Sequence, residues 1–307
     1  MRIAVVGAGA IGCLFGSKLH RAGQSVLLIH HNRHVAASIR NKGVRIKELS
    51  GKVVQAHIET KSGLSRRDRP ELILVTVKAY DTEEAAALIK KSVAPRVPVL
   101  SLQNGLGNVE SLQHYLGSDT TIAGTTTEGA LTTGPGEVVH TGSGMTWVGE
   151  TNGTVSERCL IIETAFRRAG FSTIVTKNIQ GVLWTKAIVN SAINPVSALT
   201  RVRNGDLQKS PELRDVASKT IGEGSAVAHA NGVLLKPSPK SLFPKVLAST
   251  LTNKSSMLQD IEAGRKTEIR QLNGMISRLG SAVGVSTPLN DVLTRLVLGL
   301  EASQGKW

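Results

Sequence analysis

Short apolar runs alternate with stretches of helical spacing along the first half of the chain. The runs are rich in β-branched residues and predict strands at residues 3–6, 26–29, 72–77, 99–102 and 122–125. Between the first two runs, residues 13–22 have helical spacing and Gly23 would end that helix. Strands separated by helices predict a parallel sheet with crossover helices.

The pattern continues to about residue 177. Apolar segments 130–133 and 138–141 flank Gly134-Pro135-Gly136, which predicts an antiparallel hairpin. A helix over residues 155–169 and a strand over 172–175 would follow, whereas the polar stretch at 62–70 is interpreted as a loop.

After Lys177 the apolar residues keep helical spacing and the strand-like alternation disappears. Helices are predicted at residues 183–193, 212–230, 257–279 and 289–300. Ser210 before Pro211 is a favourable helix start, and Asn231-Gly232 is a favourable stop. The expected fold class is therefore α/β: a domain with a parallel sheet at residues 1–177, followed by an all-helical domain at 178–307.

Composition narrows the class of protein. The chain has 307 residues, of which 40% are hydrophobic, but no apolar run approaches the ~20 residues that a membrane helix needs. The first residues lack the apolar segment of a signal peptide. The two cysteines, Cys13 and Cys159, have no metal-binding spacing. These observations predict a cytoplasmic protein with reduced thiols and no metal.

The positive charge is concentrated near the N-terminus. The net charge is +14, and residues 1–47 contribute +8 of it with no Asp or Glu. A basic chain is often a nucleic-acid binder, but aromatic residues are only 3% and no nucleic-acid-binding motif occurs. A smaller anion is the favoured partner of the N-terminal segment.

A dinucleotide fingerprint lies within this basic segment. Residues 7–12 (GAGAIG) match G-x-G-x-x-G after a predicted strand and before a predicted helix. Gly7 would permit the tight turn, Gly9 would let the backbone approach a pyrophosphate, and Gly12 would let the helix pack on the strand. The helix start would supply N–H groups and a partial positive charge, so all six residues, Gly7, Ala8, Gly9, Ala10, Ile11 and Gly12, are candidate cofactor contacts. The fingerprint predicts that residues 1–177 are a Rossmann-type dinucleotide-binding domain and that the all-helical residues 178–307 are the substrate-binding domain.

The second predicted strand is not followed by the acid typical of NAD-binding proteins. Its end reads IHHNRH (residues 29–34), and the first acid of the chain is Glu48. Arg33, with His31 or His34, could bind the 2′-phosphate that such an acid would repel, which predicts NADP(H) over NAD(H). The alternative is a solvated basic loop, and a metal pair of His30 and His34 lacks a third ligand.

A dinucleotide-binding domain followed by a helical domain predicts hydride transfer to a substrate. Reduction of a ketone would need a proton donor near the carbonyl oxygen, and the helical half offers one candidate set. Lys186, Asn190 and Asn194 recur every four residues and would share one face of a helix. A cation and two amides on an apolar helix would need polar partners if buried, and the alternative is a solvated face.

Several further motifs occur in a fixed order along the chain. They are the glycine fingerprint, VKAYDT (77–82), QNGLG (103–107), GTTT (124–127), the Lys186/Asn190/Asn194-Pro195 block, NG (204–205), NKSSMLQDI (253–261) and TEI (267–269). Together they resemble the 2-dehydropantoate 2-reductase, or ketopantoate reductase, family over almost the whole chain.

The resemblance implies NADPH-dependent reduction of 2-dehydropantoate to (R)-pantoate, a step towards pantothenate and coenzyme A, with Lys186 as proton donor. Asn104 would meet both cofactor and substrate. The implied cofactor contacts also include Lys78, Ala130 and Glu268, and the implied substrate contacts are Asn190, Asn194, Asn204, Asn253 and Ser256. An unbroken helix would separate Ser256 from Glu268 by ~18 Å, so Glu268 is assigned to the nicotinamide ribose or to orienting Lys186, unless Gly264 breaks that helix.

One residue departs from the family pattern, and other functions stay open. The family commonly has Arg where this chain has His31, with Arg33 two residues later. The alternatives are an NADP-dependent reductase of another branched 2-oxo acid and a non-enzymatic dinucleotide sensor or nucleic-acid binder. The sequence is silent on oligomeric state, and a homodimer is an open alternative.

Overall fold

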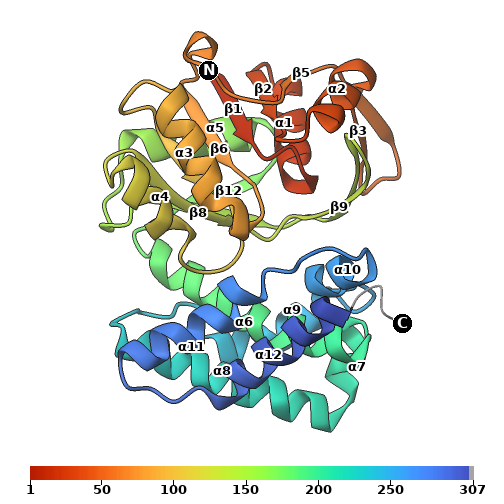
Figure 1. Ribbon diagram of the computed structural model, residues 1–307, viewed down its shortest axis with the longest axis vertical. Coiled ribbons are helices and arrows are strands. Elements are labelled where there is room, and N and C mark those ends of the chain that lie inside the picture. Colours follow the sequence, from red (N-terminus) through yellow and green to blue (C-terminus); the bar gives the residue numbers. More distant parts are fainter. Residues whose placement is uncertain (304–307) are drawn as a thin grey trace. The chain divides into compact units, whose positions relative to one another are not determined.

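The computed structural model describes residues 1–303, which form two compact units (Figure 1). The first unit comprises Met1–Gln103 and Asn108–Ile179. The second comprises the short segment Asn104–Gly107 together with the chain from Gln180 onward. The prediction of an α/β Rossmann-type part followed by a helical part is confirmed, since the first unit contains every strand described and the second contains only helices and loops.

The first unit is built on an eight-stranded sheet in the order β12-β11-β8-β7-β6-β1-β2-β5. All neighbouring pairs are parallel except β11 with β8. The strands are β1 (Arg2–Val6), β2 (Ser25–Ile29), β5 (Glu59–Lys61), β6 (Leu72–Val75), β7 (Val99–Ser101), β8 (Thr121–Thr126), β11 (Met145–Gly149) and β12 (Ser172–Val175).

Helices cover both faces of this sheet, which explains why its central strands are continuously apolar. The helices of the first unit are α1 (Ala10–Arg21), α2 (Arg33–Lys42), α3 (Thr82–Ser92), α4 (Asn108–Leu116) and α5 (Glu157–Arg168). Alternate residues of β1 enter different cores: Ile3 and Val5 lie in the core that includes Leu14 of α1, whereas Ala4 and Val6 lie in another core that includes residues of α3 and α4.

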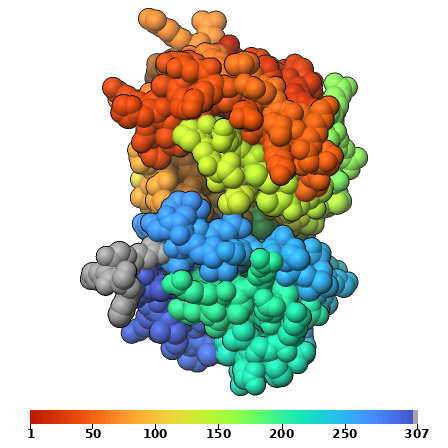
Figure 2. All heavy atoms as spheres, turned by 90° about the vertical axis from the view of Figure 1, so that its right-hand side faces the viewer, coloured from red at the N-terminus to blue at the C-terminus, as the bar shows by residue number. Residues whose placement is uncertain are grey.

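A second sheet of four strands, in the order β4-β3-β10-β9, completes the first unit. The predicted hairpin is confirmed as β9 (Gly129–Gly134) and β10 (Glu137–Gly142), which pair antiparallel. Its partners β3 (Val44–Lys47) and β4 (Val53–Ala56) were not predicted, because four residues are too few for a clear alternation. Figure 2 shows the hairpin in yellow-green beside orange N-terminal segments.

The second unit is helical, and its core surrounds α6. Its helices are α6 (Ile179–Thr200, which begins at the end of the first unit), α7 (Asn204–Lys209), α8 (Pro211–Ala230), α9 (Pro239–Ser249), α10 (Ser256–Glu262), α11 (Asn273–Ala282) and α12 (Pro288–Ser303). The ends of α8 are as predicted: the Ser210 hydroxyl accepts the N–H of Leu213 at 3.3 Å, and Asn231 follows the last helical residue. No described helix is both long enough and apolar enough to cross a membrane.

One predicted helix is wrong, and one predicted loop contains a short 3₁₀ turn. Residues 257–279 do not form one helix, because α10 ends at Glu262 and Gly264 takes a φ of +65°, a left-handed conformation that ends helices. Residues 62–70 lie between β5 and β6, as predicted for a loop, and contain a 3₁₀ turn, Arg66–Asp68. Asp68 is buried in that turn and forms an ion pair of 2.5 Å with Lys61.

Candidate functional site

The glycine loop of residues 7–12 joins β1 to α1 and is tied to both neighbouring strands. The N–H groups of Gly7 and Ala8 both donate to the carbonyl of Ile29 at 3.0 Å, at the end of β2. The Thr76 hydroxyl, just after β6, donates to the Gly7 carbonyl at 2.8 Å. The loop is therefore held at the carboxyl edge of the parallel strands, where open α/β sheets bind ligands.

The three glycines of this loop differ in the space around them. A Cβ atom on Gly7 would lie 2.5 Å from the Val77 nitrogen, and one on Gly12 would lie 2.1 Å from the Gly7 oxygen. Gly7 also has a φ of +111°. A Cβ on Gly9 would meet nothing within 4 Å. Two glycines thus permit close packing and the third leaves open space, which are the spatial conditions that a dinucleotide fingerprint requires.

The start of α1 adds an electrostatic attraction for anions. Gly9 precedes the helix without a side-chain cap, and Ala10 and Ile11 are its first residues. The first turn contains no acidic residue. Its N–H groups and the positive end of the helix dipole are therefore available to a pyrophosphate.

The basic segment after β2 forms the start of α2. The side chain of Asn32 accepts the N–H groups of His34 and Val35, so that Arg33 and His34 occupy the first helical turn and are exposed. His31 is exposed and its ring stacks on that of His30 at 4.9 Å. Burial and the neighbouring His31 lower the pKa of His30. The first turn of α2 contains no acid, so nothing in it repels a phosphate.

Two other predicted cofactor residues also belong to the first unit. Lys78 is half-buried and lies between β6 and a 3₁₀ turn, Ala79–Asp81. Ala130 lies on β9, opposite His140 of β10. The sequence reasoning missed Gln103, whose buried amide donates to the Val77 carbonyl at 3.1 Å and thereby holds the residue before Lys78. Its only sequence signal was its place beside Asn104 in the QNGLG motif.

Lys186 lies on α6 in the second unit and contacts a residue 82 positions away. Its Nζ donates to Oδ1 of Asn104 at 2.9 Å. Burial lowers the pKa of Lys186 to about 8, while the charge of Glu268 acts in the opposite direction. An amine with such a pKa exchanges a proton readily near neutral pH, as a general acid must.

Asn104 reaches α6 because the segment 104–107 docks on residues around Gln271. The N–H of Leu106 donates to the Gln271 carbonyl at 2.8 Å. Gly105 has a φ of +86°, and a Cβ atom there would lie 2.6 Å from the same carbonyl oxygen. Only glycine fits this approach, which explains the Asn-Gly pair at 104–105.

Glu268 belongs to the same cluster. It is buried, and its carbonyl accepts the N–H groups of Gln271 and Leu272 at 3.0 and 3.1 Å. The break at Gly264 removes Glu268 from the axis of α10, so the separation expected for an unbroken helix does not apply. The charge of Glu268 raises the pKa of Lys186, so the two side chains interact electrostatically.

Asn190 and Asn194 follow Lys186 at intervals of one turn within α6. Asn194 is buried and Asn190 is half-buried. The interpretation of this stripe as a solvated face is therefore wrong. Polar side chains in such surroundings need polar partners, either within the protein or from a ligand.

The remaining predicted substrate residues form a second group. Asn204 begins α7, and its N–H donates to the Asn253 carbonyl at 3.1 Å. The Asn204 Nδ2 donates to Thr250, whereas its buried Oδ1 has no hydrogen-bond partner within residues 1–303. Ser256 is exposed at the first position of α10, and the buried Ser255 before it caps that helix. The second unit thus brings Asn104, Lys186 and Glu268 together, and joins Asn204 to Asn253.

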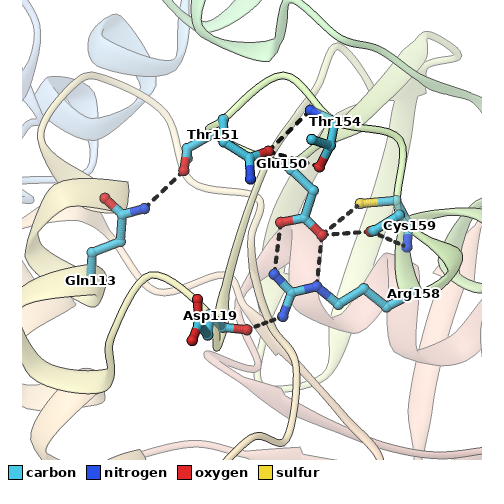
Figure 3. A network of polar contacts seen from close by, with 9 residues as sticks. Gln113, Asp119, Glu150, Thr151, Thr154, Arg158 and Cys159 are labelled. Carbon is cyan, nitrogen blue, oxygen red and sulfur yellow. Dashed lines mark hydrogen bonds and ion pairs between the residues drawn. The ribbon is translucent and has the colours of Figure 1, made fainter.

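Figure 3 shows a polar network around Glu150 that was not predicted. Two bonds of 2.7 Å join Arg158 to the Glu150 carboxylate, and the Ser156 hydroxyl donates to it at 2.5 Å. Arg158 also donates to the Asp119 carbonyl. Gly149, just before Glu150, pairs with Ala123 near the start of β8, so the network lies at the amino edge of the parallel strands. It joins β11 to α5 and is structural.

The two cysteines form no disulfide, and no cluster of metal-binding side chains occurs within residues 1–303. Cys13 and Cys159 are buried free thiols. Burial raises the pKa of the Cys13 thiol to about 12. Such a thiol stays protonated and unreactive. Within residues 1–303, no group of three or more His, Cys, Asp or Glu side chains could hold a metal ion.

Comparisons with known proteins agree with the fold and the order of the motifs. Residues 3–153 match the family model for ketopantoate reductase PanE/ApbA, and residues 178–301 match the model of its C-terminal part. The 2-dehydropantoate 2-reductase of Pyrococcus abyssi is 38% identical over 306 residues, covering 100% of both chains. That of Pyrococcus horikoshii is 39% identical over 306 residues, covering 99% of both.

Solved structures show the same similarity. The crystal structure of a PanE/ApbA family ketopantoate reductase from Ralstonia eutropha JMP134 has a TM-score of 0.91 at 33% identity and covers 99% of both chains. A ternary structure of D-mandelate dehydrogenase with NADH and anilino(oxo)acetate has a TM-score of 0.92 at 28% identity, again covering 99% of both. The family models and the full-length relatives show that this chain belongs to the ketopantoate reductase family of oxidoreductases.

Proposed function

We propose that this chain reduces 2-dehydropantoate to (R)-pantoate, a step towards pantothenate and coenzyme A, with NADPH as the reductant. The observation that carries the proposal is the amine of Lys186, which contacts Asn104 and has a pKa of about 8 in a chain whose relatives are named 2-dehydropantoate 2-reductase. A pyridine nucleotide agrees with the family and with the NADH bound to D-mandelate dehydrogenase.

In this proposal the first unit holds the dinucleotide. The open space at Gly9 and the uncapped start of α1 fit a pyrophosphate. His31 and Arg33 would bind the 2′-phosphate, because the adjoining helix turn has no acid to repel it. Lys78 and the Ala130 backbone would add further contacts. When bound, the reduced nicotinamide supplies the hydride.

The second unit supplies the proton and the contacts to the organic acid. Lys186 in its ammonium form donates a proton to the developing alkoxide, and Asn104 Oδ1 accepts a hydrogen bond from that ammonium and so aims it. Glu268 favours the charged form of the lysine. The amides of Asn190, Asn194, Asn204 and Asn253 and the Ser256 hydroxyl would bind the carboxylate and hydroxyl groups of the substrate.

A second candidate is reduction of an aryl 2-oxo acid with NADH, which the similarity to D-mandelate dehydrogenase favours. One assay separates the two: absorbance of the reduced nicotinamide is followed with 2-dehydropantoate and with benzoylformate, each with NADPH and with NADH. We expect the highest kcat/KM for 2-dehydropantoate with NADPH. A preference for benzoylformate would overturn the substrate, and equal values for NADPH and NADH would overturn the 2′-phosphate site.

Arg33→Ala sharpens the cofactor assignment. This substitution should lower kcat/KM for NADPH about tenfold or more and leave kcat/KM for NADH unchanged, since only NADPH carries the 2′-phosphate. Arg40→Ala, which changes another arginine of α2 outside its first turn, is the matched control and should change neither value.

A further inference from the structure

The helix that carries Lys186 contains a proline in its interior. Pro195 lies within α6, which runs from Ile179 to Thr200. Proline has no N–H, so the carbonyl of Ser191, four residues earlier, receives no helical hydrogen bond from it. Ser191 is fully buried, and a buried carbonyl needs a donor from elsewhere.

Asn273 provides that donor. It is the first residue of α11 and fully buried, and its Nδ2 donates to the Ser191 carbonyl at 2.9 Å. The same amide nitrogen also donates to Oδ1 of Asn290 at 3.0 Å. The side chain thus supplies the hydrogen bond that the backbone of residue 195 cannot make.

The orientation of the Asn273 amide is fixed by its neighbours. The Nδ2 of Asn290 donates to the Glu223 carboxylate at 2.7 Å, which accepts only, so Asn290 turns its oxygen towards Asn273. Glu223 is itself held by the N–H groups of Leu289 and Asn290 at 2.9 and 3.0 Å, at the start of α12. The polar chain therefore runs from Glu223 through two asparagines to α6.

The point of attachment lies among the proposed substrate contacts. Ser191 directly follows Asn190, and Asn194 directly precedes Pro195. We propose that Asn273, held by Asn290 and Glu223, is a positioning residue that fixes α6 at its proline and so places Asn190 and Asn194 for the organic acid. The role of Asn190 and Asn194 rests on the proposed function. The hydrogen bond from Asn273 to the Ser191 carbonyl, which replaces the one that Pro195 cannot make and is called the helix repair below, does not.

The test is a rescue experiment. Asn273→Leu removes the donor and should raise KM for the 2-oxo acid about tenfold, with KM for NADPH unchanged, because the glycine loop belongs to the first unit. Pro195→Ala restores an N–H for the Ser191 carbonyl. The double variant N273L/P195A should therefore return KM to within about twofold of the wild-type value. A double variant as impaired as N273L would overturn the proposal.

Two further variants distinguish a positioning role of Asn273 from a general loss of stability. Thr220→Val removes another side-chain hydrogen bond to a helix carbonyl, from the fully buried Thr220 to Val216 at 2.8 Å, and should lower Tm without raising KM. If that variant raises KM as much as N273L does, the effect is general loosening and the positioning role is wrong. Where N273L does not fold, Glu223→Gln disturbs the same polar chain more mildly and should raise KM in the same direction.

Thermal unfolding separates this inference from the proposed function because it needs no substrate. N273L should lower Tm by ~4 °C or more, and P195A should recover most of that loss in the double variant. Recovery of Tm in a protein that reduces no 2-oxo acid would overturn the proposed function and retain the helix repair. Additive losses of Tm would overturn the repair itself, whatever the activity.

Discussion

The glycine loop of the first unit and the lysine cluster of the second are built in opposite ways. The loop consists of six consecutive residues, and its properties depend on backbone conformation and on the space beside Gly7, Gly9 and Gly12. The cluster consists of side chains far apart in sequence, with 82 positions between Asn104 and Lys186 and 82 between Lys186 and Glu268. Its chemistry depends on burial and charge, which local sequence does not set.

The loop and the cluster are therefore sensitive to different kinds of substitution. A site made from backbone is lost when an added atom blocks the approach of two segments. A site made from buried side chains is lost when one functional group or its electrostatic partner is removed. The four changes that follow test this contrast in order of decreasing effect on activity.

Lys186→Ala should have the largest effect. Because Lys186 is the proposed proton donor, its loss should lower kcat by roughly 10²–10⁴-fold. Binding of NADPH, measured by fluorescence titration of the reduced nicotinamide, should stay within about twofold, because the glycine loop is in the other unit. Activity within tenfold of the wild-type enzyme would remove Lys186 as the acid.

Gly12→Ala should impair folding and cofactor binding together. The new Cβ would lie 2.1 Å from the Gly7 carbonyl oxygen, so the loop must shift. We expect a lower Tm and a KM for NADPH raised by about tenfold or more. Gly9→Ala is the matched control: its Cβ meets nothing within 4 Å, so Tm should hold while KM for NADPH still rises. Equal Tm losses in both variants would contradict the spatial argument.

Glu268→Gln should change the pH dependence more than the maximal rate. Burial holds the pKa of Lys186 at about 8, and the charge of Glu268 raises it. Above that pH the ammonium form declines, so kcat for reduction should fall about tenfold per pH unit. Removing the charge lowers the lysine pKa further and should move this fall to lower pH. Glu262→Gln, an exposed carboxylate paired with Lys254, should leave the profile where it is.

Arg158→Ala should change stability alone. It removes the partner of the mostly buried Glu150 at the amino edge of the sheet, and breaking such a pair costs about 3 kcal/mol. Arg295→Ala breaks an exposed pair with Asp291 and should cost under ~0.5 kcal/mol. Chemical denaturation measures both. A changed kcat/KM in the folded Arg158 variant would show that this network acts on the site after all.

Local sequence signals were strong in the first unit. The glycine spacing, the strand before it and the missing acid after β2 are all visible within the first 47 residues. The ends of α8 in the second unit could also be predicted, because Ser210 and Asn231 interact with backbone groups only a few residues away. Such features depend on interactions over a few residues, which is why they could be predicted.

Short strands and broken helices could not be predicted in the same way. The strand β3 pairs with both β4 and β10, and this pairing comes from partners elsewhere in the chain. Residues 257–279 keep apolar residues at helical spacing, yet the chain turns at Gly264. Apolar periodicity alone does not predict a turn of this kind, because the turn depends on packing against other parts of the chain.

Spacing along the chain was enough to predict the fold class and the family, and to select candidate site residues, because each of these depends on which residue types recur at which intervals. The surroundings of these residues became visible only in the folded chain. There Lys186 contacts Asn104, burial lowers the pKa of Lys186, and Asn273 supplies the hydrogen bond missing at Pro195. The physical reason is that burial and charge act through space, between residues that only the folded chain brings together.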